Sequence, residues 1–239
     1  MKGFLLFIHL VCVGVVQAQG SQVVFDRPGV ADSPYLPNST FGYLESGINL
    51  NFPSERLSFS NFNCMFRRKI MQKIEGRVGV NCIPASYAIS NVFSNSKDIP
   101  IYLASKIPLV SREKFAFSTL VSFISPLNFS QNAVEFNTLY QWDLNRRFSF
   151  NWNLGLIKSF NHVVYSTSSF CGILNVTNDF SFFLESYNYL SFKSINEYGF
   201  DFGMTKIWYV KHQIDLSLLF NSWNNSLNTG ISMGYSLKL

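Results

Sequence analysis

Charged side chains in this sequence stand singly among apolar and small polar residues, at alternating positions of several segments. Residues two apart project from the same face of a β-strand, so each charge would share its face with Ser, Asn or Gly. Such a face can select or guide a solute, or it can pair into an ion network that fills and stabilises the interior. The candidates are Glu45, Glu75, Arg77, Glu135, Glu185, Asp201 and Asp215, with Lys106 and Lys238 at equivalent positions.

Nucleophilic and metal chemistry have few residues to draw on. Three of the four cysteines follow the leader, Cys64, Cys82 and Cys171, and no CxxC or Cys/His spacing suggests a metal site. Whether any of them pair stays open. We therefore expect no metal and no cofactor.

One alternative is an outer-membrane lipid-modifying hydrolase, which needs a serine, a histidine and an orienting acid. The one local set is His162 with Ser166, Ser168 and Glu185, and no nucleophile motif surrounds it. We therefore do not expect an enzyme.

The elements that must position the charges are β-strands. From Phe148 to Leu156 every second residue is apolar, and the residues between are Ser149, Asn151, Asn153 and Gly155. This period of two is typical of strands with unlike faces. Extended along the chain, it predicts about twelve strands, at 40–51, 57–67, 73–82, 99–109, 113–124, 132–143, 147–158, 163–176, 179–190, 196–208, 211–222 and 228–239.

Strand length and connection length favour a membrane barrel over a soluble sandwich. Most predicted strands have 10–14 residues, whereas transmembrane strands need about 9–11 at their usual tilt and soluble strands have about 5–6. Short connections alternate with longer ones such as Ile83–Asp98 and Ser222–Leu227. The sequence therefore predicts an all-β fold, a single antiparallel transmembrane barrel of about twelve strands. It would have short periplasmic turns, longer outer loops and both termini on the periplasmic side.

Composition agrees with two different solvents for the two faces. The 239 residues are 47% hydrophobic and 14% charged, with 25 Phe, against about 25% charged in an average soluble domain. A disordered chain would have few aromatics, and a helical membrane protein would gather its apolar residues into blocks of about 20. We expect Tyr and Trp in the interfacial girdles. A net charge of +5 without a basic run gives no case for nucleic acid.

The chain divides into three parts. Residues 1–18 have the build of a secretory signal peptide, with Lys2, an apolar core and Val16-Gln17-Ala18 before the cleavage point. Residues 19–38 form an N-terminal periplasmic segment, and residues 39–239 form the barrel. The segment contains Asp26 and Arg27 within a proline-rich stretch, and we expect it to tuck into the periplasmic mouth with Arg27 paired to a lumen carboxylate.

Several of these motifs together resemble a bacterial family, the outer-membrane transporter family named for the meta-pathway of phenol degradation. The matching stretches keep the family's order along nearly the whole mature chain, with Phe25 in place of its Thr and Leu239 in place of its terminal Phe. They are Asp26-Arg27-Pro28, Asp32-Ser33-Pro34, Glu45-x-Gly47, Phe66-Arg67, Glu75-Gly76-Arg77-Val78-Gly79, Phe183-Leu184-Glu185-Ser186-Tyr187, Asp201-Phe202-Gly203-Met204-Thr205 and Gln213-Ile214-Asp215-Leu216-Ser217. The resemblance implies an outer-membrane barrel associated with transport of small hydrophobic or aromatic compounds.

The expected function is passive passage of a small solute across a bacterial outer membrane, without a covalent step. The expected partners are outer-membrane lipid, the barrel-assembly machinery and the solute. Besides the hydrolase, the second alternative is a plugged structural barrel that transports nothing.

Overall fold

The structure is a computed structural model that describes residues 32–36, 39, 41–52, 58–80, 100–126, 132–160, 164–191, 197–223 and 226–239. The expected signal peptide, Asp26 and Arg27 lie outside the described residues. Within the described residues, no helix has the length and apolar character needed to cross a membrane.

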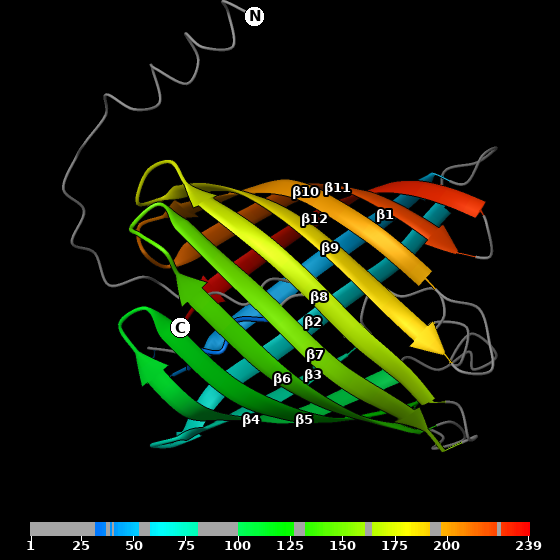
Figure 1. The fold of residues 1–239 in the computed structure, drawn as a ribbon, viewed down its shortest axis with the longest axis horizontal. Coiled ribbons are helices and arrows are strands. Elements are labelled where there is room, and N and C mark those ends of the chain that lie inside the picture. Colours follow the sequence, from blue (N-terminus) through cyan, green and yellow to red (C-terminus); the bar gives the residue numbers. More distant parts are fainter. Residues whose placement is uncertain are drawn as a thin grey trace, which may run out of the picture.

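Twelve strands make a closed antiparallel barrel in which each strand pairs with its neighbours in sequence (Figure 1). β1 pairs with β12 from Tyr43–Lys238 to Phe52–Thr229, and this pairing closes the ring. The strands are β1 Tyr43–Phe52, β2 Ser58–Met71, β3 Ile74–Val80, β4 Pro100–Arg112, β5 Phe115–Pro126, β6 Ala133–Asp143, β7 Phe148–Ser159, β8 Val164–Asn175, β9 Phe180–Ser191, β10 Glu197–Trp208, β11 His212–Trp223 and β12 Ser226–Lys238. The predicted fold class is confirmed.

The two ends of the barrel differ. At one, here called the turn end, five short connections follow β2, β4, β6, β8 and β10. Leu239 donates its N–H to the Gly42 carbonyl (3.0 Å) at this end, so the beginning of β1 and the C-terminus meet beside the turns (Figure 1). The other end, here called the loop end, carries the remaining connections.

Every strand boundary lies within three residues of the sequence prediction except the end of β2. β2 continues four residues past the predicted end at Arg67, because Arg68, Lys69 and Met71 still pair with β3. The expected longer connection at Ser222–Leu227 is wrong. Trp223 pairs with Ser226, so β11 and β12 form a hairpin whose strands are joined by only two residues.

The alternation of side chains gives each strand an apolar outer face and a polar inner one. On β7, Phe148, Trp152 and Leu156 are exposed, whereas Ser149 and Asn153 are buried. Large apolar side chains cover the outside from β5 to β12, among them Val121, Phe136, Leu156, Phe170, Leu184, Phe202, Leu218 and Met233. Because a bilayer satisfies no backbone polar group, a closed barrel with this exterior is suited to span one.

The expected girdle of Tyr and Trp holds for only some of these residues. Tyr140 lies on the outside near the turn end, stacked on Phe117 at 4.7 Å and on Trp142 at 5.8 Å, with Trp152 at 5.9 Å. The prediction is wrong for five tyrosines whose position in the alternation directs them into the barrel, where they are at most 6% exposed. These are Tyr43, Tyr102, Tyr165, Tyr187 and Tyr189.

Candidate functional site

Nine charged residues were predicted to face the interior. Of these, Lys106 is fully buried and Lys238 is only partly buried. The other seven all face the interior. Each is at most 5% exposed, while its neighbours in sequence lie on the outer face. The barrel brings three of them, Glu45, Glu75 and Arg77, into one cluster near the turn end. It places the other four elsewhere on the inner wall, on β6 and on β9 to β11.

Glu75 is the centre of the cluster because three cations converge on it from three strands. Arg77 Nε lies 2.6 Å from Glu75 Oε1, Lys106 Nζ lies 3.1 Å from Oε2, and Arg67 Nη1 lies 3.8 Å from Oε2. Glu75, Lys106 and Arg67 are fully buried. Buried charges require partners of opposite sign, so these side chains depend on one another.

Arg67 extends the cluster to β1. Its Nε donates to Glu45 Oε1 at 2.8 Å, and its guanidinium lies over the Tyr43 ring, 4.8 Å from the centroid. Arg67 was not among the predicted site residues. It shares a face of β2 with Met65. The alternation along β2 was the signal that could have placed Arg67 inside the barrel.

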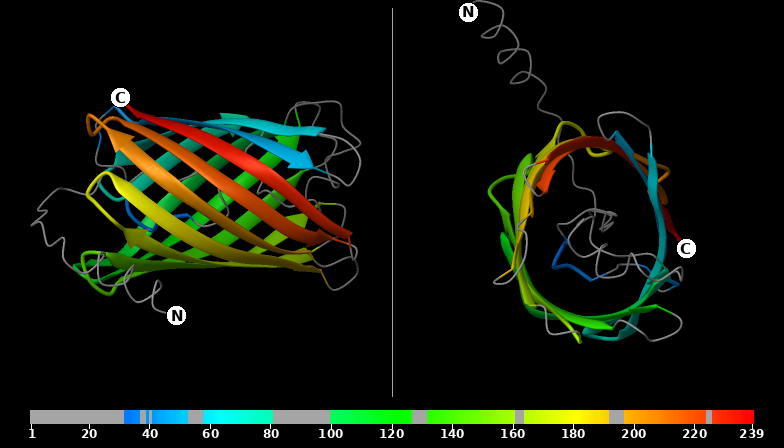
Figure 2. Two further views of the ribbon diagram at one scale, coloured as in Figure 1. Left: turned by 90° about the horizontal axis from the view of Figure 1, so that it is seen from above. Right: turned by 90° about the vertical axis from the view of Figure 1, so that its right-hand side faces the viewer.

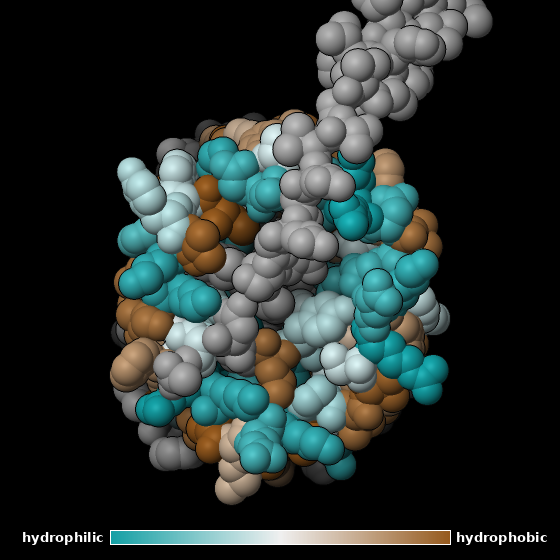
Figure 3. All heavy atoms as spheres, turned by 90° about the vertical axis from the view of Figure 1, so that its left-hand side faces the viewer, coloured by the Kyte–Doolittle hydropathy of each residue, from teal (hydrophilic) through white to brown (hydrophobic). Residues whose placement is uncertain are grey.

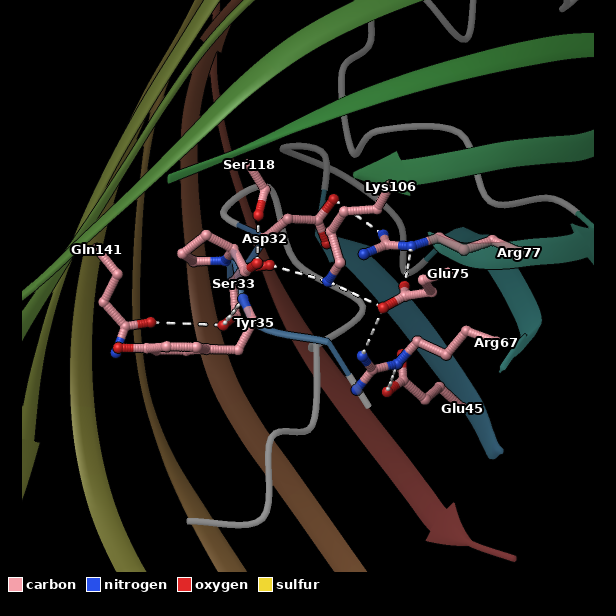
Figure 4. Close-up of polar contacts among 11 residues, drawn as sticks. Asp32, Ser33, Tyr35, Glu45, Arg67, Glu75, Arg77, Lys106, Ser118 and Gln141 are labelled. Carbon is pink, nitrogen blue, oxygen red and sulfur yellow. Dashed lines mark hydrogen bonds and ion pairs between the residues drawn. The ribbon is translucent and has the colours of Figure 1, made fainter. Parts of the chain in front are cut away.

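The described part of the N-terminal segment, Asp32–Leu36, lies inside the barrel (Figure 2, right). Asp32 Oδ2 accepts a hydrogen bond from Arg77 Nη1 at 3.0 Å, and Lys106 Nζ donates to the Ser33 carbonyl at 3.0 Å (Figure 4). Asp32 thereby supplies the third carboxylate, beside Glu45 and Glu75, to a cluster of three cations. The segment thus balances the charge of this ion cluster.

Further contacts hold the segment against β5, β6 and β7. Ser118 Oγ donates to the Pro34 carbonyl. With its amide oriented to satisfy both atoms, Asn153 accepts from the Asp32 N–H (2.6 Å) and donates to the Asp32 carbonyl (3.2 Å). Tyr35 donates its hydroxyl to Asp143 Oδ2 at 3.1 Å.

The Tyr35 hydroxyl keeps its proton at neutral and moderately alkaline pH. Burial, followed by the nearby Asp143 carboxylate, raises the pKa of Tyr35 to about 12. The hydroxyl therefore remains a donor to Asp143 at neutral and moderately alkaline pH. Residues 32–36 lie inside the barrel mouth. That this mouth is the periplasmic one stays a prediction, and the expected pairing of Arg27 falls outside the described residues.

Three predicted carboxylates lie on neighbouring strands of the opposite wall. Glu185 on β9 and Asp201 on β10 are direct partners in the strand register. Asp215 Oδ1 on β11 accepts from Thr205 Oγ1 and from Gln213 Nε2, both at 2.9 Å. Sequence reasoning missed Glu197, which is fully buried on β10 and has the same parity as Asp201.

Glu135 on β6 belongs to a chain of polar contacts in the loop-end half. Its Oε2 accepts from Ser122 Oγ and its Oε1 from Asn137 Nδ2, both at 2.7 Å. A cluster of tyrosine and aliphatic side chains lies on the same inner wall. Its fully buried or nearly buried members are Tyr102, Ile124, Ala133, Ile157, Tyr165, Tyr187 and Tyr189.

The residues considered for hydrolase chemistry do not share a face. Ser166 and Ser168 alternate with the inward Tyr165 and Ser169, so they project outward, and Ser168 Oγ accepts from Trp152 Nε1 at 3.4 Å. Glu185 is on the inner face, and His162 lies outside the described residues. A serine on the lipid side cannot be oriented by a carboxylate in the interior, so this set forms no triad.

Figure 3 looks onto the turn end, where hydrophilic residues gather around the rim and apolar ones lie toward its outer edge. The closed twelve-stranded sheet, its apolar exterior and its polar interior define a transmembrane barrel of the bacterial outer-membrane type.

No family model matches the chain, and no curated protein matches it. Solved structures share its fold. The NanC porin has a TM-score of 0.61 at 8% identity, over 82% of this chain and 100% of NanC. The KdgM porin in complex with disordered oligogalacturonate has 0.60 at 6%, over 82% and 99%. An outer-membrane channel from Pseudomonas putida F1 has 0.56 at 9%, over 85% and 96%.

Proposed function

We propose that this protein is a porin-like channel of the bacterial outer membrane for passive passage of a small solute. The observation that carries the proposal is the contrast between the faces, because an apolar exterior suits lipid while a closed inner wall of Ser, Asn, Tyr and charged groups suits a solute path. Outer-membrane lipid and the barrel-assembly machinery are its proposed partners.

The solute path enters at the loop end, which we place on the cell surface because longer connections usually face outward. A solute there first meets the cluster around Tyr102, Tyr165 and Tyr189, whose rings and aliphatic neighbours suit a ring-shaped compound. It then meets polar groups such as Asn137 and Asn153, and last the ion cluster. The charged residues and segment Asp32–Leu36 narrow the periplasmic half.

The porins named in the structural matches support a channel over an enzyme. NanC and KdgM are porins, and the KdgM structure contains oligogalacturonate. The resemblance to the family named for phenol degradation supports a hydrophobic or aromatic solute. We propose that family assignment on the motifs quoted above.

A second candidate function is a plugged structural barrel. The fully buried cluster around Glu75 favours it, since ion pairs without exposed surface fill space rather than guide a solute. Planar-bilayer recordings separate the two functions. We expect discrete current steps from the purified folded protein. A protein that inserts, shown by its changed gel mobility without boiling, and passes no current would be a structural barrel instead.

A further inference from the structure

Two neighbouring turns at the turn end bring four cations together on the rim of the barrel. Arg112 and Lys114 lie at the β4–β5 turn, and Arg146 and Arg147 lie in the β6–β7 turn. The turns are side by side, because β5 pairs with β6 and the Asp143 N–H donates to the Lys114 carbonyl at 3.0 Å. The side chains of Arg112, Lys114 and Arg146 are exposed, and they form no ion pair within the described part of the chain. Their charges are therefore available to an external anion.

The carboxylates nearby do not cancel this charge. Glu113 is the one exposed carboxylate in the two turns. Asp143 is directed to the lumen side, where it accepts a hydrogen bond from the Tyr35 hydroxyl at 3.1 Å. The β2–β3 turn is next in the ring and adds the exposed Lys69 and Lys73. This arc of the rim, from the β2–β3 turn to the β6–β7 turn, is therefore strongly positive.

The opposite arc of the rim carries less positive charge. There Lys206, near the end of β10, forms an ion pair with Asp179 of the β8–β9 turn. The β10–β11 turn contains one cation, Lys211, and two apolar residues, Tyr209 and Val210, whose side chains are exposed. The excess of positive charge thus lies on one side of the barrel.

The backbone fixes the position of the cations at the β4–β5 and β6–β7 turns. Asn145 Oδ1 accepts from the N–H groups of Arg147 (2.8 Å) and Phe148 (3.0 Å), which closes the β6–β7 turn. Arg112 is the register partner of Phe115 across the β4–β5 turn. Because direct partners share a face of the sheet and Phe115 lies on the outer face, Arg112 lies on the outer face as well.

Five aromatic rings cover the outer face of the barrel beside these turns. The ring centroids of Phe115 and Trp142 are 5.4 Å apart, and those of Trp142 and Tyr140 are 5.8 Å apart. Tyr140 lies in turn 4.7 Å from Phe117 and 5.9 Å from Trp152. Aromatic side chains in such a group mark the boundary between hydrocarbon and headgroups. Since a strand rises about 3.3 Å per residue, cations a few residues beyond the rings lie at the level of the lipid phosphates.

We propose that the β4–β5 and β6–β7 turns form a binding site for an anionic glycerophospholipid in the leaflet at the turn end. The headgroup phosphate contacts Arg112, Lys114 and Arg146, and guanidinium groups suit phosphate because they donate two parallel hydrogen bonds. An acyl chain packs along the aromatic rings. A zwitterionic phosphatidylethanolamine has the same phosphate, but its ammonium group is repelled by these cations. The site requires that the barrel lie in a membrane, and it does not depend on passage of a solute.

Quenching of tryptophan fluorescence by brominated acyl chains measures which lipid occupies the site. The chain has four tryptophans, so Trp208→Phe and Trp223→Phe together leave Trp142 and Trp152, both beside the site, as reporters. This protein is folded into phosphatidylcholine vesicles that contain either brominated phosphatidylglycerol or brominated phosphatidylethanolamine. At equal mole fraction we expect the phosphatidylglycerol to quench more strongly, and the difference to shrink at high salt.

Substitutions separate this site from a general effect of surface charge. Arg112→Gln and Arg146→Gln should each lower the preference for phosphatidylglycerol roughly twofold to fivefold. Lys211→Gln is the matched control, because it removes the same charge from the β10–β11 turn on the far side of the ring. It should leave the preference unchanged. Gel mobility without boiling confirms that each variant is folded.

The inference is overturned if the two brominated lipids quench equally, which would leave the basic turns for a soluble acidic partner. It is also overturned if Lys211→Gln loses as much preference as Arg112→Gln. Planar-bilayer current tests the proposed function separately. Current without a lipid preference would overturn the lipid site alone, and a lipid preference without current would overturn the channel alone.

Discussion

The two halves of the lumen contain similar kinds of polar residues but hold them in place in different ways. In the turn-end half, three cations and three carboxylates close on one another, and the N-terminal segment supplies one of them, Asp32. In the loop-end half, Ser169 and Tyr189 are buried without a partner among the described residues. The first half is held together mainly by ion pairs, whereas the second is held by hydrogen bonds around Glu135 and by the packing of tyrosine rings. We therefore expect substitutions in the ion cluster to cost more stability than substitutions in the loop-end half.

Substitution of Glu75 tests the difference between the two halves most directly, and there we expect the largest loss of stability. Glu75→Ala leaves three buried cations with fewer counter-charges, and removal of one partner from a buried ion cluster costs about 3–5 kcal/mol. Urea unfolding followed by gel mobility measures the loss. Glu113→Gln, in the exposed β4–β5 turn, is the control and should be neutral. A loss below 1 kcal/mol in Glu75→Ala would contradict a stabilising role for the cluster.

The attachment of the segment should give the next largest effect. Asp32→Asn removes the third carboxylate and weakens a contact between charged groups worth about 1.5–3 kcal/mol. The segment should loosen, and the single-channel conductance should rise. Asp179→Asn, in the β8–β9 turn, should leave the conductance unchanged. An unchanged conductance in Asp32→Asn would mean that the segment does not narrow the path.

A smaller effect is expected in the loop-end half from Gly155→Ala on β7. The added methyl forces the Asn137 amide to move, and since that group ends a short side chain we expect about 1 kcal/mol of destabilisation, the low end of overpacking costs. Gly172→Ala on β8 is a close control, because its Cβ meets Phe150 at an ordinary 3.4 Å. Thermal unfolding compares the two. Equal transition temperatures would argue against tight packing of Asn137 and Thr167 over Gly155.

An exposed ion pair gives the smallest effect and contrasts with the buried cluster. A hydrogen bond from Lys206, then one from Thr177, lowers the pKa of Asp179 in the β8–β9 turn. A carboxyl whose pKa falls on folding stabilises the protein above its unfolded pKa of 3.8, and that contribution disappears as the pH falls through the folded value. Lys206→Gln should therefore be slightly less stable than the wild type at pH 7 and equally stable at strongly acid pH. A large difference at pH 7 would conflict with the solvent exposure of the pair.

The sequence predicted the strands and faces because period-two alternation is a local property. Phe148 to Leu156 alternate on the lipid face, and the same rule placed Glu185, Asp201 and Asp215 inside. It was misapplied to Tyr187 and Tyr189, which share the parity of Glu185 but were expected in the girdles. Tyrosine is amphipathic and suits both the interfacial girdle and the barrel interior. Only its position in the alternation decides which of the two it occupies.

The contacts within the lumen could not be predicted from the sequence, for a different reason. The meeting of Glu75 with Lys106 depends on the register between the consecutive strands β3 and β4, and alternation along each strand does not fix that register. The contact between Asp32 and Arg77 joins a segment without alternation to a strand. The resemblance to a family marked Asp32, Glu75 and Arg77 as notable residues without indicating that they meet.

Passive passage through the lumen is tested most directly by swelling of proteoliposomes in a graded series of neutral solutes. Two variants at adjacent positions complete the measurement: Ser169→Trp fills the inner wall, and Phe170→Trp adds bulk on the lipid face. We predict solute entry above that of empty vesicles for the wild type and Phe170→Trp, falling off with solute size, and much slower entry for Ser169→Trp. Entry no faster than in empty vesicles, or equal entry in all three proteins, would contradict a channel through this lumen.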